Sequence, residues 1–306
     1  MTGPLARALA WWQAPGSARR LAALRIGLGA ILTVRLASGP YLELAHQPAA
    51  LFRPISFMRL LDDMSLPGLV GLLQVVGVLA ALGATAGLTT RMNLPLAWLV
   101  ALPLMAMTSS LGKTVHNDVL LLLALVPLVL VPARTAAAWS LDAWVARLTG
   151  PAPGPDVGDE FGWPVRTAMV VVAGAYFFSG LAKLLHAGPA WVGGNLRWVL
   201  YAASDGQPAP NGLALFVADR PLLASAVAVG TLLLELGVPV VLWRPRLAPL
   251  VVLAVAAMHA GIWAAMGLDY WPMAATAAVV LLAGTTPAGP GWRARSGAII
   301  RFGLPK

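Results

Sequence analysis

The sequence predicts an all-α membrane protein, a polytopic bundle of about eight transmembrane helices. Of its 306 residues, 59% are hydrophobic and only 11% are charged, and the mean hydropathy is +0.78. A water-soluble domain carries about 25% charged residues, so this chain has too few ionised groups to cover a soluble surface. Its apolar residues gather in runs of the length that a bilayer core requires, roughly 20 residues per helix.

Eight apolar runs are the candidate spans, and we expect helices because lipid offers the backbone no hydrogen-bond partners. The runs are residues 21–37, 66–88, 94–110, 119–132, 165–185, 222–243, 247–267 and 270–283. The fourth and eighth runs have about 14 residues each. A run of that length is also compatible with a tilted, interfacial or re-entrant helix.

Lysine and arginine set the expected orientation of these spans. With eight crossings, 13 of the 21 basic residues fall on the side that holds both termini, and 6 fall on the other side. The positive-inside rule then places both termini in the cytoplasm, in a multi-pass protein of the cell membrane. The net charge of +9 does not indicate a nucleic-acid partner, because the cations lie between apolar runs. The expected partner is the lipid bilayer.

The whole chain, residues 1–306, is expected to form one membrane domain with three segments outside the spans. Residues 1–20 form an interfacial lead-in with paired tryptophans at headgroup depth. Residues 140–163, rich in proline and glycine, form a flexible cytoplasmic loop. Residues 285–306 form a basic cytoplasmic tail. The chain has no cysteine, which excludes disulfides, thiolate metal sites and cysteine nucleophiles.

Ionisable groups at membrane depth are the candidate functional residues. Placing each one in a membrane costs roughly 2.5–3.5 kcal/mol of insertion free energy, so such groups usually face the protein interior and carry a function or a buried ion pair. One set precedes the fourth span. Lys113, His116 and Asn117 are spaced to share one face of a helical turn, and Asp118 suits the positive end of the helix that follows. The alternative interpretation is a capped helix end in the headgroup region.

A second set closes the fifth span. Tyr176, Ser179, Gly180 and Lys183 recur at helical spacing and form one stripe, which His186 follows. Lysine is scarce, with only three in the chain, and a desolvated neutral amine can act as a base. The alternative is a lysine whose ammonium group reaches the membrane interface.

The other spans supply the remaining ionisable groups. His259 and Trp263 in the seventh span are four residues apart and are expected to share a helix face. The alternative is a neutral histidine that is hydrogen-bonded inside the bundle. Glu235 in the sixth span is expected to pair with Arg25 or Arg35 of the first span as a structural buried charge.

The expected topology places several of these groups in the outer half of the bundle. They are His116, Asp118, Lys183, His186 and His259. Their placement predicts a pocket between helices that opens to the outer side. No pair of histidines has the ligand spacing of a known metal motif, so no metal is expected.

Four segments carry a family resemblance that covers nearly the whole chain. They are Leu24-Arg25-Ile-Gly27-Leu-Gly29; Tyr176-Phe-Phe-Ser-Gly180-Leu-Ala-Lys183 with Trp191 and Gly193-Gly194; Glu235-Leu-Gly-Val-Pro239 with His259-Ala-Gly-Ile; and Trp139-Ser140-Leu141-Asp142. In their order and spacing along the chain they resemble the HTTM (horizontally transferred transmembrane) family, a membrane domain related to the vitamin K-dependent gamma-carboxylase.

The resemblance implies a chemistry for two of the residues. It implies that Lys183 is the base that deprotonates a reduced membrane quinone of the vitamin K or menaquinol type. His116 is similar to a family histidine linked to oxygenation of that quinol. In the carboxylases, the oxygenated quinone then removes a proton from a substrate glutamate, which takes up CO₂. The implied partner is a secreted peptide or a redox protein. The residues expected around the quinone are Tyr176, Asn117, Asp118, His186, Trp191, His259 and Trp263.

Two features depart from the carboxylase pattern. The carboxylases carry paired lysines where this chain has Ala182 before Lys183, and they continue into a large non-membrane region, whereas this chain ends at Lys306. Two classes of function therefore stay open. One is an enzyme that oxidises a quinol and modifies a peptide or partner; the other is a non-catalytic membrane partner or binding protein of the same fold. A transporter would rest only on the intramembrane charges.

Overall fold

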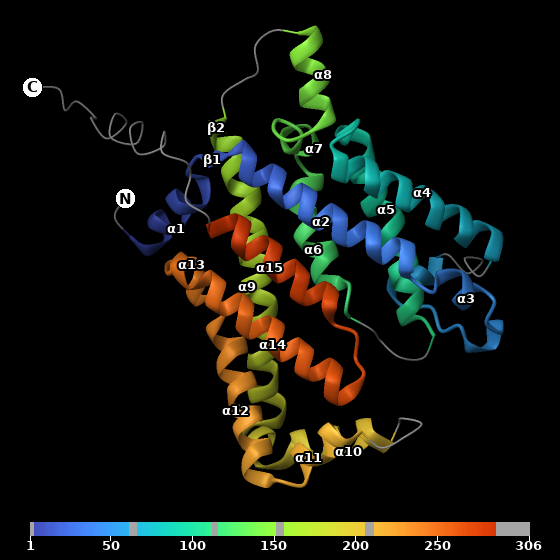
Figure 1. Cartoon of the computed structure of the whole chain (residues 1–306), viewed down its shortest axis with the longest axis vertical. Coiled ribbons are helices and arrows are strands. Elements are labelled where there is room, and N and C mark those ends of the chain that lie inside the picture. Colours follow the sequence, from blue (N-terminus) through green and yellow to red (C-terminus); the bar gives the residue numbers. More distant parts are fainter. Residues whose placement is uncertain (1–2, 61–65, 112–115, 151–155, 206–210, 286–306) are drawn as a thin grey trace, which may run out of the picture.

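The part of the chain that the structure describes is mainly helical (Figure 1). The computed structural model describes residues 3–60, 66–111, 116–150, 156–205 and 211–285. The α-helices in these ranges are α1 (Pro4–Gln13), α2 (Ala18–Ser38), α3 (Tyr41–Ala45), α4 (Pro67–Ala86), α5 (Thr90–Ser109), α6 (Val119–Val129), α7 (Pro132–Thr135), α8 (Leu141–Thr149), α9 (Asp159–Ala187), α10 (Leu196–Asp205), α11 (Gly212–Ala218), α12 (Pro221–Gly237), α13 (Val240–Trp243), α14 (Ala248–Met266) and α15 (Trp271–Thr285). Short 3-10 helices are η1 (Ala49–Leu51), η2 (Ser56–Leu60) and η4 (Pro245–Leu247), and a π-helix is η3 (Trp191–Asn195). The predicted all-α fold class is therefore confirmed.

Each of the eight apolar runs is largely helical, but the helices differ in length. By length and composition α2, α4, α5, α9 and α14, the last together with η4, can cross a membrane. A sixth candidate arises if α11 and α12, which meet at 99°, form one broken span. The helices α6 and α15 are shorter, with 11 and 15 residues. The described residues thus give a multi-pass membrane protein with five or six candidate spans, and the count of eight stays a prediction.

Proline and glycine set the ends of several spans. Pro67, Pro221 and Pro249 occupy the first turn of α4, α12 and α14, where proline loses no helical hydrogen bond. Gly87 ends α4 and Gly267 ends α14 in the left-handed conformation, with φ values of 71° and 64°. These local signals explain why the observed helices begin and end close to the predicted runs.

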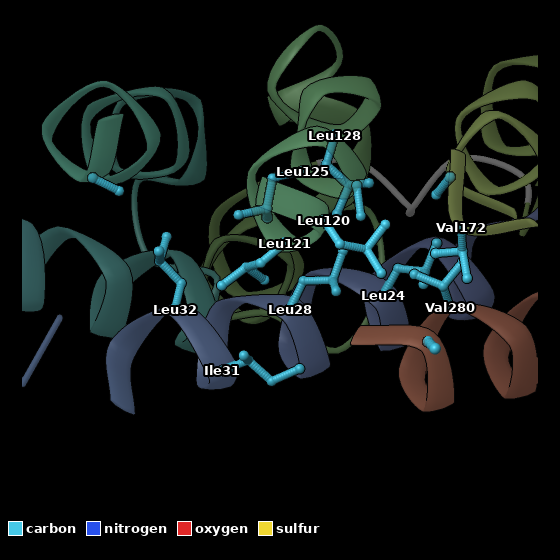
Figure 2. Close-up of a cluster of buried hydrophobic side chains, with 14 of the residues drawn as sticks. Leu24, Leu28, Ile31, Leu32, Leu120, Leu121, Leu125, Leu128, Val172 and Val280 are labelled. Atoms are coloured by element: carbon cyan, nitrogen blue, oxygen red, sulfur yellow. The ribbon is translucent and has the colours of Figure 1, made fainter. Parts of the chain in front are cut away.

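Helix α2 runs through the middle of the bundle, in contact with α4, α6, α9 and α15 (Figure 1). Its residues Leu24, Leu28 and Leu32 are buried and recur once per turn. Figure 2 shows them pointing toward leucines of α6 such as Leu120 and Leu121. The apolar core is therefore organised around α2 rather than around the longer α9.

Two glycines let the neighbours of α2 approach its backbone. A Cβ atom on Gly27 would lie 2.5 Å from Val279 Cγ1 of α15, and one on Gly29 would lie 2.6 Å from Thr85 Oγ1 of α4. Both distances are shorter than real Cβ contacts, so a side chain at either position would force its neighbour to shift. Small residues of this kind are what close helix packing in a membrane requires.

The segment at residues 140–163 differs from its prediction as a flexible loop in the parts that the structure describes, residues 140–150 and 156–163. Its first part forms α8, which begins where Ser140 Oγ accepts the N–H of Ala143 at 2.9 Å. Its last part is the beginning of α9 at Asp159, next to the two-residue strand β2 (Val157–Gly158). The apolar residues of α8 recur every three or four positions, a helical pattern that the neighbouring prolines obscure in the sequence.

The N-terminal segment is tied to the start of α9. Its strand β1 (Gly16–Ser17) pairs antiparallel with β2, with Gly16 opposite Gly158. In α1, Trp12 Nε1 donates to Thr167 Oγ1 at 2.9 Å. The predicted lead-in therefore contains a helix that is fixed to the bundle. Of the predicted tail, only residue 285 lies within the described residues.

Candidate functional site

An open cavity of about 560 Å³ lies against the last turns of α9, beside η3 and α10. In Figure 1, α10 and α11 lie across the ends of α9 and α12 at this end of the molecule. Ligand pockets for small organic molecules typically measure about 300–1,000 Å³. The cavity is lined by Ser179, Ala182, Lys183, His186, Ala187, Trp191, Asn195, Trp198 and Val199.

Lys183 is the cation in the wall of this cavity. Its Nζ donates to Oε1 and Oε2 of Glu235, both at 2.7 Å, and to Ser179 Oγ at 2.9 Å. The ammonium group also lies 5.5 Å from the centre of the Trp191 ring, within the range of a cation–π contact. The lysine side chain is 22% exposed and the glutamate side chain 7%, so the amine is reachable while its carboxylate partner is buried.

The hydrogen bonds of Lys183 decide its resting state. An ammonium group has three donors and no acceptor, and here three oxygen atoms receive them. Glu235 is satisfied in turn, since Ser179 Oγ also donates to its Oε1 at 3.1 Å. The resting site is therefore an ion pair. For Lys183 to act as a base, one of its protons must first move to Glu235.

The local sequence explains how two helices bring this pair together. Ser179 and Lys183 are four residues apart on α9 and so share a face. Gly180, between them, lets α12 approach: a Cβ atom there would lie 3.0 Å from Glu235 Cβ and 3.1 Å from Leu236 Cγ. Ser179, Gly180 and Lys183 of the predicted stripe thus belong to the surface of α9 on which α12 packs beside the cavity.

The predicted pairing of Glu235 with Arg25 or Arg35 is wrong, because Glu235 binds Lys183. Arg25 is fully buried, and its guanidinium donates to the backbone carbonyls of Thr135 at 2.7 Å and Trp139 at 2.5 Å. It holds the connection between α7 and α8 against α2. The sequence could show that these charges are buried, but their partners depend on which helices are neighbours.

Arg35 has a carboxylate partner of its own. Its Nε and Nη2 donate to the two oxygens of Asp118 at 2.7 and 2.8 Å, and its Nη1 lies 3.8 Å from Asp269. Asp118 was expected to interact with the start of α6, and it occupies the position before that helix, but its side chain makes no capping bond there. His116 and Asn117 precede α6 outside any helix, and Lys113 lies outside the described residues. The predicted helical turn from Lys113 to Asn117 therefore falls mostly outside the described residues, and it stays a prediction.

A second polar cluster lies between α9, α14 and the segment before α15. Tyr176 OH and His259 Nε2 are 2.9 Å apart, and both side chains are buried. The ring of Tyr270 is 5.7 Å from that of His259, and its hydroxyl is 3.4 Å from His116 Nε2. Asn117 Nδ2 donates to the backbone carbonyl next to Tyr270, that of Asp269, at 2.5 Å. These contacts fix the loop between α14 and α15.

The structure therefore separates groups that the sequence analysis placed in one pocket. Lys183, His186 and Trp191 line the cavity, whereas His116 and His259 are not among its lining residues. His259 and Trp263 are four residues apart on α14, as expected, but their surroundings differ, since His259 is buried and Trp263 is 65% exposed. The scarce lysine and the two imidazoles belong to two different sites.

Some residues of the two sites were not singled out in the sequence. Asn195 and Trp198 line the cavity from η3 and α10, and Tyr270 joins the second cluster. Ser179 was noticed only as a small member of the stripe, although it bonds both members of the ion pair. The amphipathic spacing of α10 was the available signal for Trp198, because it marks a helix lying across the bundle end.

No metal centre is apparent in the part of the chain that the structure describes. Within it, no group of three or more histidine, aspartate or glutamate side chains is arranged to hold a metal ion.

Comparison with known proteins gives one positive finding. The family model described as the HTTM domain matches residues 14–284, which is most of the chain. No curated protein and no solved structure matches the chain significantly.

Proposed function

The chain belongs to the HTTM family, and from this premise we propose that it is a membrane enzyme that binds a reduced quinone beside Lys183 and accepts its hydroxyl proton. One observation supports the proposal most strongly. The Lys183 amine lies in the wall of an open, tryptophan-lined cavity and is hydrogen-bonded to a buried carboxylate. A cation and its counter-ion at a ligand cavity are the parts that proton transfer requires.

The residues of the cavity fit an aromatic ligand of this kind. Trp191 and Trp198 supply flat apolar surface, and Asn195 and His186 supply polar groups for ring hydroxyls. A reduced quinone would contribute an ionisable hydroxyl group and two electrons. A quinone of the menaquinol type has a long apolar tail, and an open cavity beside the helices gives such a tail a route to the lipid.

Proton transfer begins within the ion pair. A proton moves from Lys183 Nζ to a Glu235 oxygen, along a bond of 2.7 Å, and leaves a neutral amine. That amine accepts the proton of a hydroxyl group in the cavity and becomes an ammonium again. Ser179 holds the Lys183 amine and the Glu235 carboxylate in place, since it is hydrogen-bonded to both. Glu235 then holds the additional proton, and a reduced quinone bound here would supply the electrons that dioxygen accepts.

The second step, modification of a secreted peptide or a redox partner, is proposed from the family resemblance. The support in this chain is the position of the cavity at an end of the bundle, where a partner outside the bilayer can reach it (Figure 1).

The experiment measures quinol oxidation by purified protein in lipid nanodiscs, in air-saturated buffer, with a menaquinol analogue. Lys183→Arg is the decisive variant, because arginine keeps the charge but stays protonated and cannot serve as a base. We expect Lys183→Arg and Lys183→Ala to abolish turnover, and Lys183→Arg to retain quinol binding. Arg220→Lys is the control, since Arg220 stacks on Phe216 outside the cavity. Full turnover in Lys183→Arg would overturn the proposal.

A specific observation favours a second candidate, a binding protein without chemistry. All three ammonium hydrogens of Lys183 already have partners within the protein, which is what a purely structural ion pair would show. This candidate predicts that wild-type protein binds the quinol analogue without turnover. It also predicts that Glu235→Gln alters stability and leaves quinol binding intact.

A further inference from the structure

The helix α8 exposes a complete apolar face. Four of its residues are spaced three and four apart and so lie on one side of the helix. Their exposed fractions range from 42% to 67%, and α8 has no buried residue. They are Leu141, Trp144, Val145 and Leu148. Such a face does not remain in water when an apolar surface is within reach, because its burial is favourable.

The start of α8 is fixed at the end of the membrane-spanning bundle. Both carboxylate oxygens of Asp142 accept backbone N–H groups at the beginning of α5, from Thr89 at 2.7 Å and Thr90 at 2.9 Å. The N–H of Asp142 donates to the carbonyl of Gly87, which ends α4, at 2.9 Å. Since α4 and α5 are candidate spans, α8 begins where these spans leave the hydrocarbon. Figure 1 shows it extending outward from that end of the bundle.

Tryptophan and arginine mark the same level of the molecule. Trp139, just before α8, has a side chain that is 57% exposed. Its backbone φ of 47° is disfavoured for a bulky residue. Its carbonyl accepts a hydrogen bond from buried Arg25, which holds this conformation. Exposed tryptophans are typical of the membrane–water boundary. Arg91 and Arg147 are exposed at the start of α5 and on α8, and such cations suit lipid phosphates.

We propose that α8 is an interfacial helix that lies on the membrane, with Leu141, Trp144, Val145 and Leu148 inserted into the leaflet at the α4–α5 end of the bundle. The bilayer is the occupant that these observations favour. It is present wherever the spans are, it reaches the level at which Asp142 fixes the helix, and its headgroup region accommodates tryptophan and arginine side chains together.

The absence of cysteine from the chain makes a direct test practical. Single-cysteine variants Leu148→Cys and Val145→Cys carry a nitroxide label on the apolar face. Ala146→Cys carries it on the opposite face of the same helix and is the matched control, because Ala146 is also exposed. The labelled full-length protein is reconstituted into vesicles of phosphatidylethanolamine and phosphatidylglycerol. Collision rates with oxygen, which concentrates in lipid, and with a neutral nickel chelate, which stays in water, are measured by electron paramagnetic resonance.

We expect the ratio of oxygen to nickel collision rates to be several-fold higher at positions 145 and 148 than at position 146. If labels on both faces collide with the nickel chelate at equally high rates, α8 projects into water and the proposal is overturned. Labels at 145 and 148 that are immobilised and shielded from both reagents would show that protein covers the face, and would overturn it as well. The labelled variants are compared only where size-exclusion profiles match the wild type.

Discussion

The ion pair between Arg35 and Asp118 offers the sharpest test of how the bundle is held together. The two side chains are only 13% and 7% exposed and share two hydrogen bonds of 2.7 and 2.8 Å. Arg35 lies in the last turn of α2, and Asp118 directly precedes α6. Each charge therefore also interacts favourably with a helix dipole, Arg35 at the C-terminal end of α2 and Asp118 at the N-terminal end of α6. The perturbation is Arg35→Met, which keeps an unbranched apolar side chain and removes the cation.

The expected loss follows from the burial of the pair. Removing one partner of a buried, hydrogen-bonded ion pair costs about 3–5 kcal/mol, because the other charge is left uncompensated. Arg35→Met should reach this range. Asp118→Asn should cost about 1 kcal/mol less than Arg35→Met, because Arg35 keeps a second carboxylate, that of Asp269, at 3.8 Å. Asp269 is 54% exposed, and an exposed ion pair stabilises a protein by up to about 1 kcal/mol. The double variant Arg35→Met/Asp118→Asn should cost less than the sum of the two single losses.

The assay is reversible unfolding in mixed micelles with increasing dodecyl sulfate, followed by circular dichroism, which gives the free energy of unfolding. Arg59→Met is the control, since Arg59 is exposed and its bond to the Pro54 carbonyl measures 3.5 Å. Its effect should stay within about 0.5 kcal/mol. A loss below about 1 kcal/mol for Arg35→Met, equal to that of an exposed pair, would refute the reasoning.

Two further predictions concern α9 and use the same unfolding measurement. Gly180→Ala places a Cβ atom 3.0 Å from Glu235 Cβ and should cost about 1–3 kcal/mol by overpacking. Gly174→Ala, on the same helix, has its nearest neighbour at 3.8 Å and should be neutral or stabilise by up to about 1 kcal/mol; equal effects of the two would contradict the close packing of α9 and α12. Tyr176→Phe removes the partner of buried His259 Nε2 and should cost about 1–3 kcal/mol, and a change below about 0.5 kcal/mol would show that the bond contributes little.

The composition of the chain and its apolar runs were sufficient for the fold class and for the positions of the apolar helices. A chain with few charges and long apolar runs folds as helices in a membrane, because lipid offers its backbone no hydrogen-bond partners. Proline and glycine mark where several of these helices end. The same signals are local, so they also located the stripe of Ser179, Gly180 and Lys183 on α9. These signals did not predict α8, because the proline-rich run next to it obscured the helical spacing of its apolar residues in the sequence.

Which buried charges meet was decided only by the tertiary structure. Lys183 and Glu235 are 52 residues apart, and Arg35 and Asp118 are 83 residues apart. Spacing within one helix says which side chains share a face, but not which other helix that face contacts. The contact depends on how closely helices approach, which glycines such as Gly180 control. For this reason the sequence identified the lysine and the histidines as unusual, whereas the folded bundle placed the lysine at a cavity and His259 beside Tyr176.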